Sequence, residues 1–407
     1  MVELLSPAKD FTCLVAALEN GADSVYIGVE ECNMRANIPG FTLEDIAKAT
    51  QITHEYESKL YLCTNTILKD TDIAKLENNL PYYEEYEVDA LILSDLGLLN
   101  STKNYKFDTH LSIQENITNT PTLKILQKLG ITRAVLSREL NLEEIQKINT
   151  HTPIETEIFI HGALCTAISG RCYLSSYLYG KSANCGECLQ PCRKKWQLTS
   201  QDNEKLTLTT TPHTNNNNLT YLLSPKDLCM IEYIPELIQT KTHAFKIEGR
   251  ARPAEYVATT TKIYKQAIQQ YTTNPEEYTT KPEWITELKK VFNRGFDQGF
   301  YFNKPTENSP QNQSQLIKKD IGQVTNYYNK IQVAEIKIWD TLKTGDTILI
   351  QGPTTGSIQH TITSIQINKK NINKAEKNQN IGIKIPYKIR PHDNVYKLNK
   401  RQNIREQ

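Results

Sequence analysis

Short apolar runs alternate with longer segments of helical periodicity through the first 160 residues, and this alternation restricts the fold more than any other feature. The predicted strands are Glu3–Leu5, Ser24–Gly28, Leu60–Thr64, Ala90–Ser94, Thr109–Ser112, Arg133–Ser137, Glu157–His161 and, after a long interruption, Phe245–Gly249. Helices between them are predicted to begin at the capping residues Thr42 and Asn141. Strands connected by helices pair in parallel. Eight such units favour an α/β fold of the (β/α)8 TIM-like barrel type, with an open doubly wound sheet as the alternative.

Polar residues follow the predicted strands at their C-terminal ends, where barrels of this kind carry their active sites. The candidates at these positions are Asn65, His110, Arg138, His161, Glu248 and Arg250. His161 and His110 are candidates for proton transfer, because histidine titrates near neutral pH. Glu248 is a further catalytic candidate. The alternative for each residue is a structural role, as a hydrogen-bonded core histidine, an ion-pair partner or a loop residue that caps a helix.

A long insertion, residues 162–244, separates the last two predicted strands and carries most of the cysteines. Of the nine cysteines in the chain, the insertion holds Cys165, Cys172, Cys185, Cys188, Cys192 and Cys229. The first residues show no basic and apolar regions of a signal peptide, so we expect a cytoplasmic, reducing location in which disulfides are disfavoured. Clustered thiols in such a protein indicate metal or redox chemistry.

The cysteine spacings do not fit the usual zinc-ribbon pattern of two CxxC pairs. Iron–sulfur clusters accept varied spacings of cysteine thiolates, so such a cluster is the favoured interpretation. Zinc, or no metal and ordinary buried cysteines, are the alternatives. Cys192 and Cys229 compete for the fourth ligand position, and Cys185 is a spare or a substitute.

A polar segment, residues 303–315, predicts a linker that ends the barrel domain of residues 1–302. Short alternating apolar runs follow and predict a small β-barrel over residues 316–398, with a basic tail over 399–407. From Leu316 onward, 16 Lys and Arg face 7 Asp and Glu, a net charge of +9, whereas the preceding residues carry 31 and 39, a net charge of −8. The basic C-terminal domain therefore suggests a polyanionic partner, or a solvated basic surface with no ligand. No apolar run approaches the ~20 residues that cross a bilayer.

The segment from Glu157 to Ser175, which includes His161-Gly162-Ala163-Leu164-Cys165 and Gly170-Arg171-Cys172, resembles the signature of the peptidase U32 family. The resemblance extends to Leu4–Ala8, His110–Ser112, Ser137–Leu140, Gly186–Arg193 and Lys246–Arg250, and covers nearly the whole chain. The sequence departs from the family at Cys32, where an aromatic residue is expected before Asn33-Met34-Arg35, and in its Asn-rich insertion.

The family name implies proteolysis, and some members are described as collagenases. Better-understood members hydroxylate RNA: one group makes 5-hydroxyuridine at the tRNA wobble position with prephenate, and another acts on ribosomal RNA. Other members work as pairs of related proteins that assist oxygen-independent ubiquinone hydroxylation. The resemblance therefore also implies a second, homologous U32 protein as a partner of this chain. Several members carry a [4Fe-4S] cluster. By resemblance, Cys165, Cys172 and Cys188 are its ligands here, completed by Cys192 or Cys229, and the C-terminal barrel, which looks like the second domain of translation GTPases, suits an RNA partner.

Three hypotheses follow. The first is hydroxylation of RNA, most directly of tRNA, with the basic domain holding phosphates. In it, Arg250, Arg138 and Arg35 bind a dicarboxylate such as prephenate, because a guanidinium matches a carboxylate in a two-pronged geometry. Asn65 is a further substrate-binding candidate. The second is a peptidase with Cys165 as nucleophile, although the sequence has neither an HExxH nor a GxSxG motif. The third is a noncatalytic RNA-binding factor.

Overall fold

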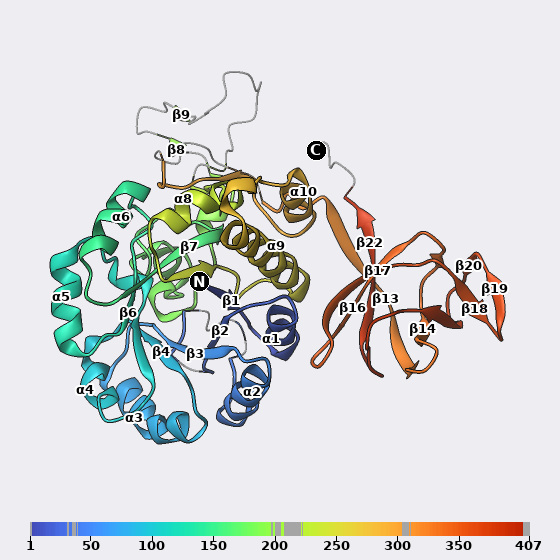
Figure 1. Cartoon of the computed structure of the whole chain (residues 1–407), viewed down its shortest axis with the longest axis horizontal. Helices are drawn as coiled ribbons and strands as arrows, with labels where there is room; N and C mark the ends of the chain where they lie inside the picture. Colours follow the sequence, from blue (N-terminus) through green and yellow to red (C-terminus); the bar gives the residue numbers. More distant parts are fainter. Residues whose placement is uncertain are drawn as a thin grey trace.

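The computed structural model describes residues 2–30, 32–34, 38, 40–196, 198–199, 205–206, 221, 223–302, 309 and 311–401. Its larger domain is a closed barrel of parallel strands surrounded by helices (Figure 1). The barrel strands, in spatial order, are β1 (Glu3–Pro7), β2 (Ser24–Gly28), β3 (Lys59–Thr64), β4 (Ala90–Leu93), β5 (Asp108–Leu111), β6 (Arg133–Val135), β7 (Glu155–Ala163) and β11 (Ala244–Ile247). Strand β11 pairs in parallel with both β7 and β1, which closes the barrel. The TIM-like prediction is confirmed, and the open sheet is excluded.

Helices connect the strands on the outside of the barrel (Figure 1). They are α1 (Phe11–Leu18), α2 (Leu43–Glu55), α3 (Asp70–Glu85), α4 (Leu99–Thr102), α5 (Thr120–Leu129), α6 (Leu142–His151), α8 (Ile234–Gln239), α9 (Ala254–Thr273) and α10 (Pro282–Lys290). The predicted caps are confirmed, because Thr42 and Asn141 each accept a hydrogen bond from the backbone three residues on and form capping boxes.

The barrel interior changes in character along its axis. At the N-terminal ends of the strands, Arg133 donates hydrogen bonds to Glu3 and Glu155 at 2.7–3.0 Å and 2.6–2.8 Å. Lys246 forms a 2.7 Å ion pair with Glu157, whose side chain is fully buried. Apolar and aromatic side chains, among them Tyr61, fill the next layer. The N-terminal end is therefore sealed by an ion network, which leaves the C-terminal end as the open mouth.

The insertion adds strands and short helices at this mouth. Strand β10 (Asp227–Cys229) pairs antiparallel with the extended end of β7, and β12 (Phe296–Asp297) pairs with β10. The cysteine segment contains α7 (Leu174–Tyr179) and the 3-10 helices η3 (Ala183–Cys185) and η4 (Pro191–Arg193). Other short elements are η1 (Leu96–Leu98), η2 (Ile113–Glu115), η5 (Ile231–Tyr233), η6 (Pro275–Glu277), β8 (Leu198–Thr199) and β9 (Lys205–Leu206). The Asn-rich part of the insertion lies outside the described residues.

The C-terminal domain is an antiparallel sheet around its own apolar core of mostly isoleucines. Its strands, in spatial order, are β17 (Gly356–Thr361), β16 (Thr347–Gly352), β22 (Asn394–Lys400), β13 (Leu316–Tyr328), β14 (Val333–Ile338), β21 (Asn380–Lys384), β18 (Ile365–Ile367) and β19 (Lys370–Ile372). A second small pair joins β15 (Leu342–Lys343) to β20 (Lys374–Ala375). The predicted all-β domain is confirmed. Strand β22 reaches Lys400, two residues past the predicted boundary, and residues 402–407, like most of the predicted linker, lie outside the described residues.

The two domains meet where β17 packs on α1 and α9 (Figure 1). Gly356, with φ +70°, approaches the backbone of α1 so closely that a Cβ there would lie 2.9 Å from the amide nitrogen of Ala16. Glu255 of α9 accepts hydrogen bonds from Lys318 at 3.1 Å and Gln351 at 2.9 Å. The interface therefore combines backbone contact with a partly buried ion pair. Among the described residues, no helix is both long and apolar enough to span a bilayer.

Candidate functional site

The cysteine segment of the insertion is tied to the loops at the barrel mouth. The side-chain amide of Asn116 donates to the carbonyl of Ser169 at 3.4 Å, and the backbone N–H of Ile67 donates to the carbonyl of Asn184 at 3.3 Å. Gly170, with φ +73°, packs so tightly on Gln114 that a Cβ at this position would collide with that side chain. The segment therefore lies over the C-terminal ends of the central strands.

Three cysteines of this segment are electrostatic neighbours of a fourth, Cys192. Burial raises the pKa of Cys192, and the neighbouring thiols of Cys165, Cys188 and Cys172 raise it further. Cys165 is exposed, and the other three are half-buried. Asn184 holds Cys172 in place by accepting its backbone N–H at 2.9 Å. This is the set that the sequence proposed with Cys192 as the fourth member.

A buried arginine, Arg193, lies beside these thiols and was not among the residues singled out from the sequence. It is 8% exposed and donates hydrogen bonds to the carbonyls of Leu164 and Pro225 and to the hydroxyl of Ser224. Burial lowers its pKa, while the neighbouring Cys192 and Cys165 act in the opposite direction. Its position directly after Cys192 is the sequence signal that would have pointed to it. A cation here offsets the negative charge that deprotonated thiols would carry.

Cys229 lies elsewhere, on β10, where it packs against α9. It is 5% exposed, and the hydroxyl of Tyr264 on α9 donates to its sulfur at 3.8 Å. Burial raises its pKa to about 12, and the charges of Glu232 and Asp227 raise it further. Its environment is that of a packed core cysteine. Cys185 is exposed.

A network of amides and hydroxyls occupies the barrel mouth beneath the insertion. Asn65 donates to Ser112 at 2.9 Å and to Gln114 at 3.2 Å. Arg250, 7% exposed, donates to Asn33 at 3.3 Å. Gly28 lies under this pair, where a Cβ would come within 2.6 Å of the Arg250 guanidinium. The structure thus places Asn65 and Arg250 at the same end of the barrel.

Arg138 lies at the foot of the insertion. Its guanidinium donates to the carbonyl of Ala163 at 2.7 Å and lies 4.0 Å from the centre of the Phe159 ring. Its buried Nε has no hydrogen-bond partner among the described residues. Glu248 is half-buried at the end of β11, and its backbone N–H donates to the carbonyl of His161. Arg35 lies outside the described residues.

The two candidate histidines lie in different surroundings. His110 is buried inside the barrel, with its ring edge-on to Tyr61 at 4.8 Å, and burial lowers its pKa well below the usual value. His161 is packed by Tyr256 and Tyr264 of α9, and burial lowers its pKa to about 3. Both rings are therefore neutral at pH 7. The side chain of His161 faces α9 rather than the network of Asn65 and Arg250.

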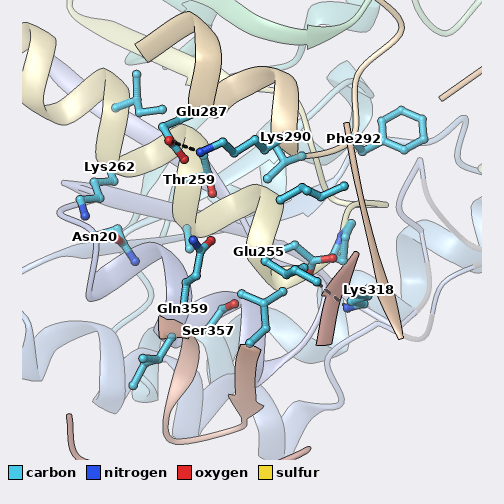
Figure 2. A pocket seen from close by; sticks show the side chains of 18 of the residues that line it. Asn20, Glu255, Thr259, Lys262, Glu287, Lys290, Phe292, Lys318, Ser357 and Gln359 are labelled. Carbon is cyan, nitrogen blue, oxygen red and sulfur yellow. Dashed lines mark hydrogen bonds and ion pairs between the residues drawn. The ribbon is translucent and has the colours of Figure 1, made fainter. Parts of the chain in front are cut away.

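A separate cavity of about 980 Å³ lies between the two domains (Figure 2). Helices α9 and α10 form one side of this cavity, and strands of the C-terminal domain form the other. Figure 2 shows Lys290 beside Glu287 and Lys318 beside Glu255, and Lys262 lines the same space. Cations outnumber carboxylates among the lining residues. The cavity thus offers a cationic surface distinct from the mouth of the barrel.

Comparisons with known proteins identify the family. Residues 9–311 match the model of peptidase family U32. An uncharacterized protease of Methanocaldococcus jannaschii is 46% identical over 98% of both chains. A collagenase of Porphyromonas gingivalis is 35% identical over 98% of both chains. The tRNA hydroxylation protein P1 of Bacillus subtilis is 32% identical over 89% of this chain and 86% of its own length. This chain, with its barrel, its cysteine-bearing insertion and its C-terminal β domain, therefore belongs to peptidase family U32.

Proposed function

We propose that the protein is an RNA-hydroxylating enzyme that converts a tRNA uridine to 5-hydroxyuridine and holds a [4Fe-4S] cluster on Cys165, Cys172, Cys188 and Cys192. The proposal is supported by the position of Cys192, which has Cys165, Cys172 and Cys188 as electrostatic neighbours in the segment tied to the barrel mouth. The relative from Bacillus subtilis named as a tRNA hydroxylation protein supports the substrate class.

The thiols suit a cluster better than a single ion. Four thiolates bound to one ion at ~2.3 Å must bring their sulfurs within about 3.8 Å of one another. Among the described residues, no group of three or more His, Cys, Asp or Glu is arranged to hold one ion. A four-iron cluster gives each thiolate its own iron, which separates the sulfurs further. Arg193 lies where it would balance part of the negative charge of such a site. When bound, the cluster supplies one-electron transfer.

The residues at the mouth would bind and orient the reactants. Among the described residues, Arg250 and Arg138 are the candidates to bind carboxylates, and a dicarboxylate such as prephenate is the co-substrate that we propose for them. The amide of Asn65, fixed by Ser112 and Gln114, would hold a polar edge of the base or of the co-substrate in one orientation. His110 is neutral, so it would contribute shape and hydrogen bonding rather than charge, whereas His161 faces α9 and would act only through packing.

The RNA itself would extend beyond the mouth. The C-terminal domain carries the excess of Lys and Arg, and the cavity between the domains exposes further cations. Phosphates neutralised there would make binding dependent on salt. The domain would therefore hold the tRNA body while one nucleotide reaches the barrel.

The test is deletion of the corresponding gene followed by mass spectrometry of tRNA nucleosides. We expect 5-hydroxyuridine to fall, and to return with the wild-type chain but not with Cys165→Ser, Cys172→Ser, Cys188→Ser or Cys192→Ser. Cys185→Ser, in the same segment, is the matched control and should restore the nucleoside. Anaerobically purified protein should carry about four iron and four sulfide per chain. Unchanged 5-hydroxyuridine in the deletion strain, or colourless iron-free protein, would contradict the proposal and favour a noncatalytic RNA-binding role.

The peptidase alternative rests on the relatives named as a protease and a collagenase. A thiol peptidase needs a base beside its nucleophile. Among the described residues, no histidine forms a hydrogen bond or ion pair with any of these four thiols, so the arrangement favours a ligand set. Gelatin cleavage that is lost in Cys165→Ser but kept in Cys192→Ser would reverse this conclusion.

A further inference from the structure

Helix α7 and its flanks expose an unusual set of large side chains beside the four thiols. Tyr177 is 90% exposed and Tyr173 is 75% exposed, whereas tyrosine in a folded protein usually covers most of its ring. Ile168, Leu178, Tyr179 and Leu189 in the same segment are also exposed. A surface of this kind marks an interaction site.

The two most exposed rings share one face of the helix. Tyr173 and Tyr177 are four residues apart, and the N–H of Tyr177 donates to the carbonyl of Tyr173 at 2.8 Å, so their side chains lie one turn apart. Ser175, on the buried side of α7, fixes the helix by accepting the N–H of Leu189 at 3.1 Å. The helix backbone is therefore fixed on its buried side, and the two rings point toward solvent.

The surroundings of the rings are basic, although the barrel is acidic. The segment Ala163–Trp196 carries five Lys and Arg, of which four are exposed and Arg193 is buried, and a single Glu, a net charge of +4, while the remaining residues before Leu316 carry a net charge of −12. Lys194 lies 4.7 Å from the centre of the Tyr179 ring and donates to its hydroxyl at 2.8 Å. Aromatic rings interleaved with cations are typical of surfaces that bind unpaired nucleotides, because bases stack on the rings and phosphates meet the cations.

The surface formed by Tyr173 and Tyr177 lies next to the cysteines that we propose as cluster ligands. Tyr173 directly follows Cys172, and Leu189 directly follows Cys188. A strand that stacks on α7 would therefore pass beside the gathered thiols and the mouth below them. We propose that Tyr173 and Tyr177 form a stacking platform for unpaired bases of a single-stranded RNA loop. This inference rests on the proposed function for its RNA partner and adds the way in which that RNA is held.

The test measures binding of a fluorescein-labelled single-stranded oligoribonucleotide of about 12 residues to the whole chain, at fixed salt, by fluorescence anisotropy. Loss of one stacked base on alanine substitution weakens binding roughly 5- to 150-fold. We therefore expect Tyr173→Ala/Tyr177→Ala to weaken binding at least about tenfold. Tyr173→Phe/Tyr177→Phe keeps the rings and should bind as the wild type does. Tyr82→Ala, an exposed tyrosine on α3, is the matched control and should have no effect.

Because both rings are solvent-exposed, the alanine variant should keep the wild-type melting temperature, which separates lost binding from lost folding. The same oligonucleotide annealed to its complement should bind with no dependence on the two rings. Equal affinity of the alanine variant and the wild type would overturn the inference. An equal loss in the phenylalanine variant would also overturn it, because the hydroxyls rather than stacking would then carry the contact. Loss of gelatin binding with RNA binding intact would overturn it in favour of a protein partner.

The outcome can be told apart from that of the proposed function. Binding is measured without turnover, so Cys165→Ser should bind the oligonucleotide even if it makes no 5-hydroxyuridine. If the cysteine variants abolish the modified nucleoside while the tyrosine variants keep RNA affinity, only the stacking platform is refuted. If the tyrosine variants lose RNA affinity but the gene deletion leaves 5-hydroxyuridine unchanged, only the hydroxylation is refuted.

Discussion

Replacing Arg133 with methionine removes the cation that closes the N-terminal end of the barrel. The side chain is 5% exposed and holds Glu3 through two hydrogen bonds and Glu155 through two more. It also lies 3.6 Å from Glu157, whose second oxygen has no other hydrogen-bond partner among the described residues. Methionine keeps an unbranched apolar stem but leaves these carboxylates without their shared cation.

The expected loss is large because Glu3 stays mostly buried without its cation, although Glu157 keeps its ion pair with Lys246 and Glu155 is half exposed. Removing one partner of a buried ion pair costs about 3–5 kcal/mol in the free energy of unfolding. Burial alone would raise the pKa of Glu3, but hydrogen bonding and ion pairing with Arg133 outweigh it and lower the pKa below 4.5. A lowered carboxyl pKa contributes stability that is present above pH 4.5 and is lost as the pH falls through the folded-state pKa. The difference between wild type and variant should therefore be largest at neutral pH and shrink in acid.

Urea unfolding followed by circular dichroism at pH 7 and at pH 4 measures both quantities. Lys374→Met breaks an exposed pair with Glu376 and serves as the control, with no measurable change expected. The reasoning fails if Arg133→Met costs less than about 1 kcal/mol at pH 7, or if its cost grows as the pH falls.

Three further outcomes follow from the geometry. Arg193→Met should lower the iron bound per chain by at least about half in anaerobic preparations, because it removes the cation beside the thiols, whereas the exposed Arg171→Met should leave the iron content unchanged. Gly162→Ala should cost on the order of 3 kcal/mol in urea unfolding, because φ is +106° and the new Cβ would collide with the carbonyl of Glu248. Glu255→Ala should lower the melting temperature of the C-terminal domain in calorimetry, with a cost of ~1 kcal/mol from two lost contacts across the domain interface. An unchanged transition would show that backbone packing alone holds the domains.

The barrel strands could be predicted because each is a local apolar run bounded by turn residues. Strand β10 was not predicted, since its three residues, Asp227–Cys229, carry no alternating pattern of their own and form a strand only by pairing with β7. The position of a residue at the end of a predicted strand did not reveal whether its side chain points into the barrel mouth or toward the surrounding helices. The pairing of β7 with β11 shifts register between Lys246 and Ile247, and His161, which ends the predicted strand, faces α9.

The choice of the fourth thiol shows the same limit. Cys192 and Cys229 are both plausible by spacing, and our proposal takes Cys192 because the fold places it near other thiols of the segment, whereas Cys229 lies against Tyr264. Arg193 was overlooked because a lysine- and arginine-rich sequence, Arg193-Lys194-Lys195, reads as a solvated surface. Its burial depends on the carbonyls of Leu164 and Pro225, which are distant in the chain.

Helices α1 and α9, on which the C-terminal domain rests, flank β1, the strand that joins the beginning of the barrel to its last strand, β11. The C-terminal domain therefore packs beside the place where the first and last barrel strands pair. A fragment that ends at residue 302 would expose the α1 surface that Gly356 now covers. Truncation would therefore weaken the packing around the β1–β11 pairing, where the first and last strands of the barrel meet. The C-terminal domain thus stabilises the closure of the barrel as well as providing a contact surface.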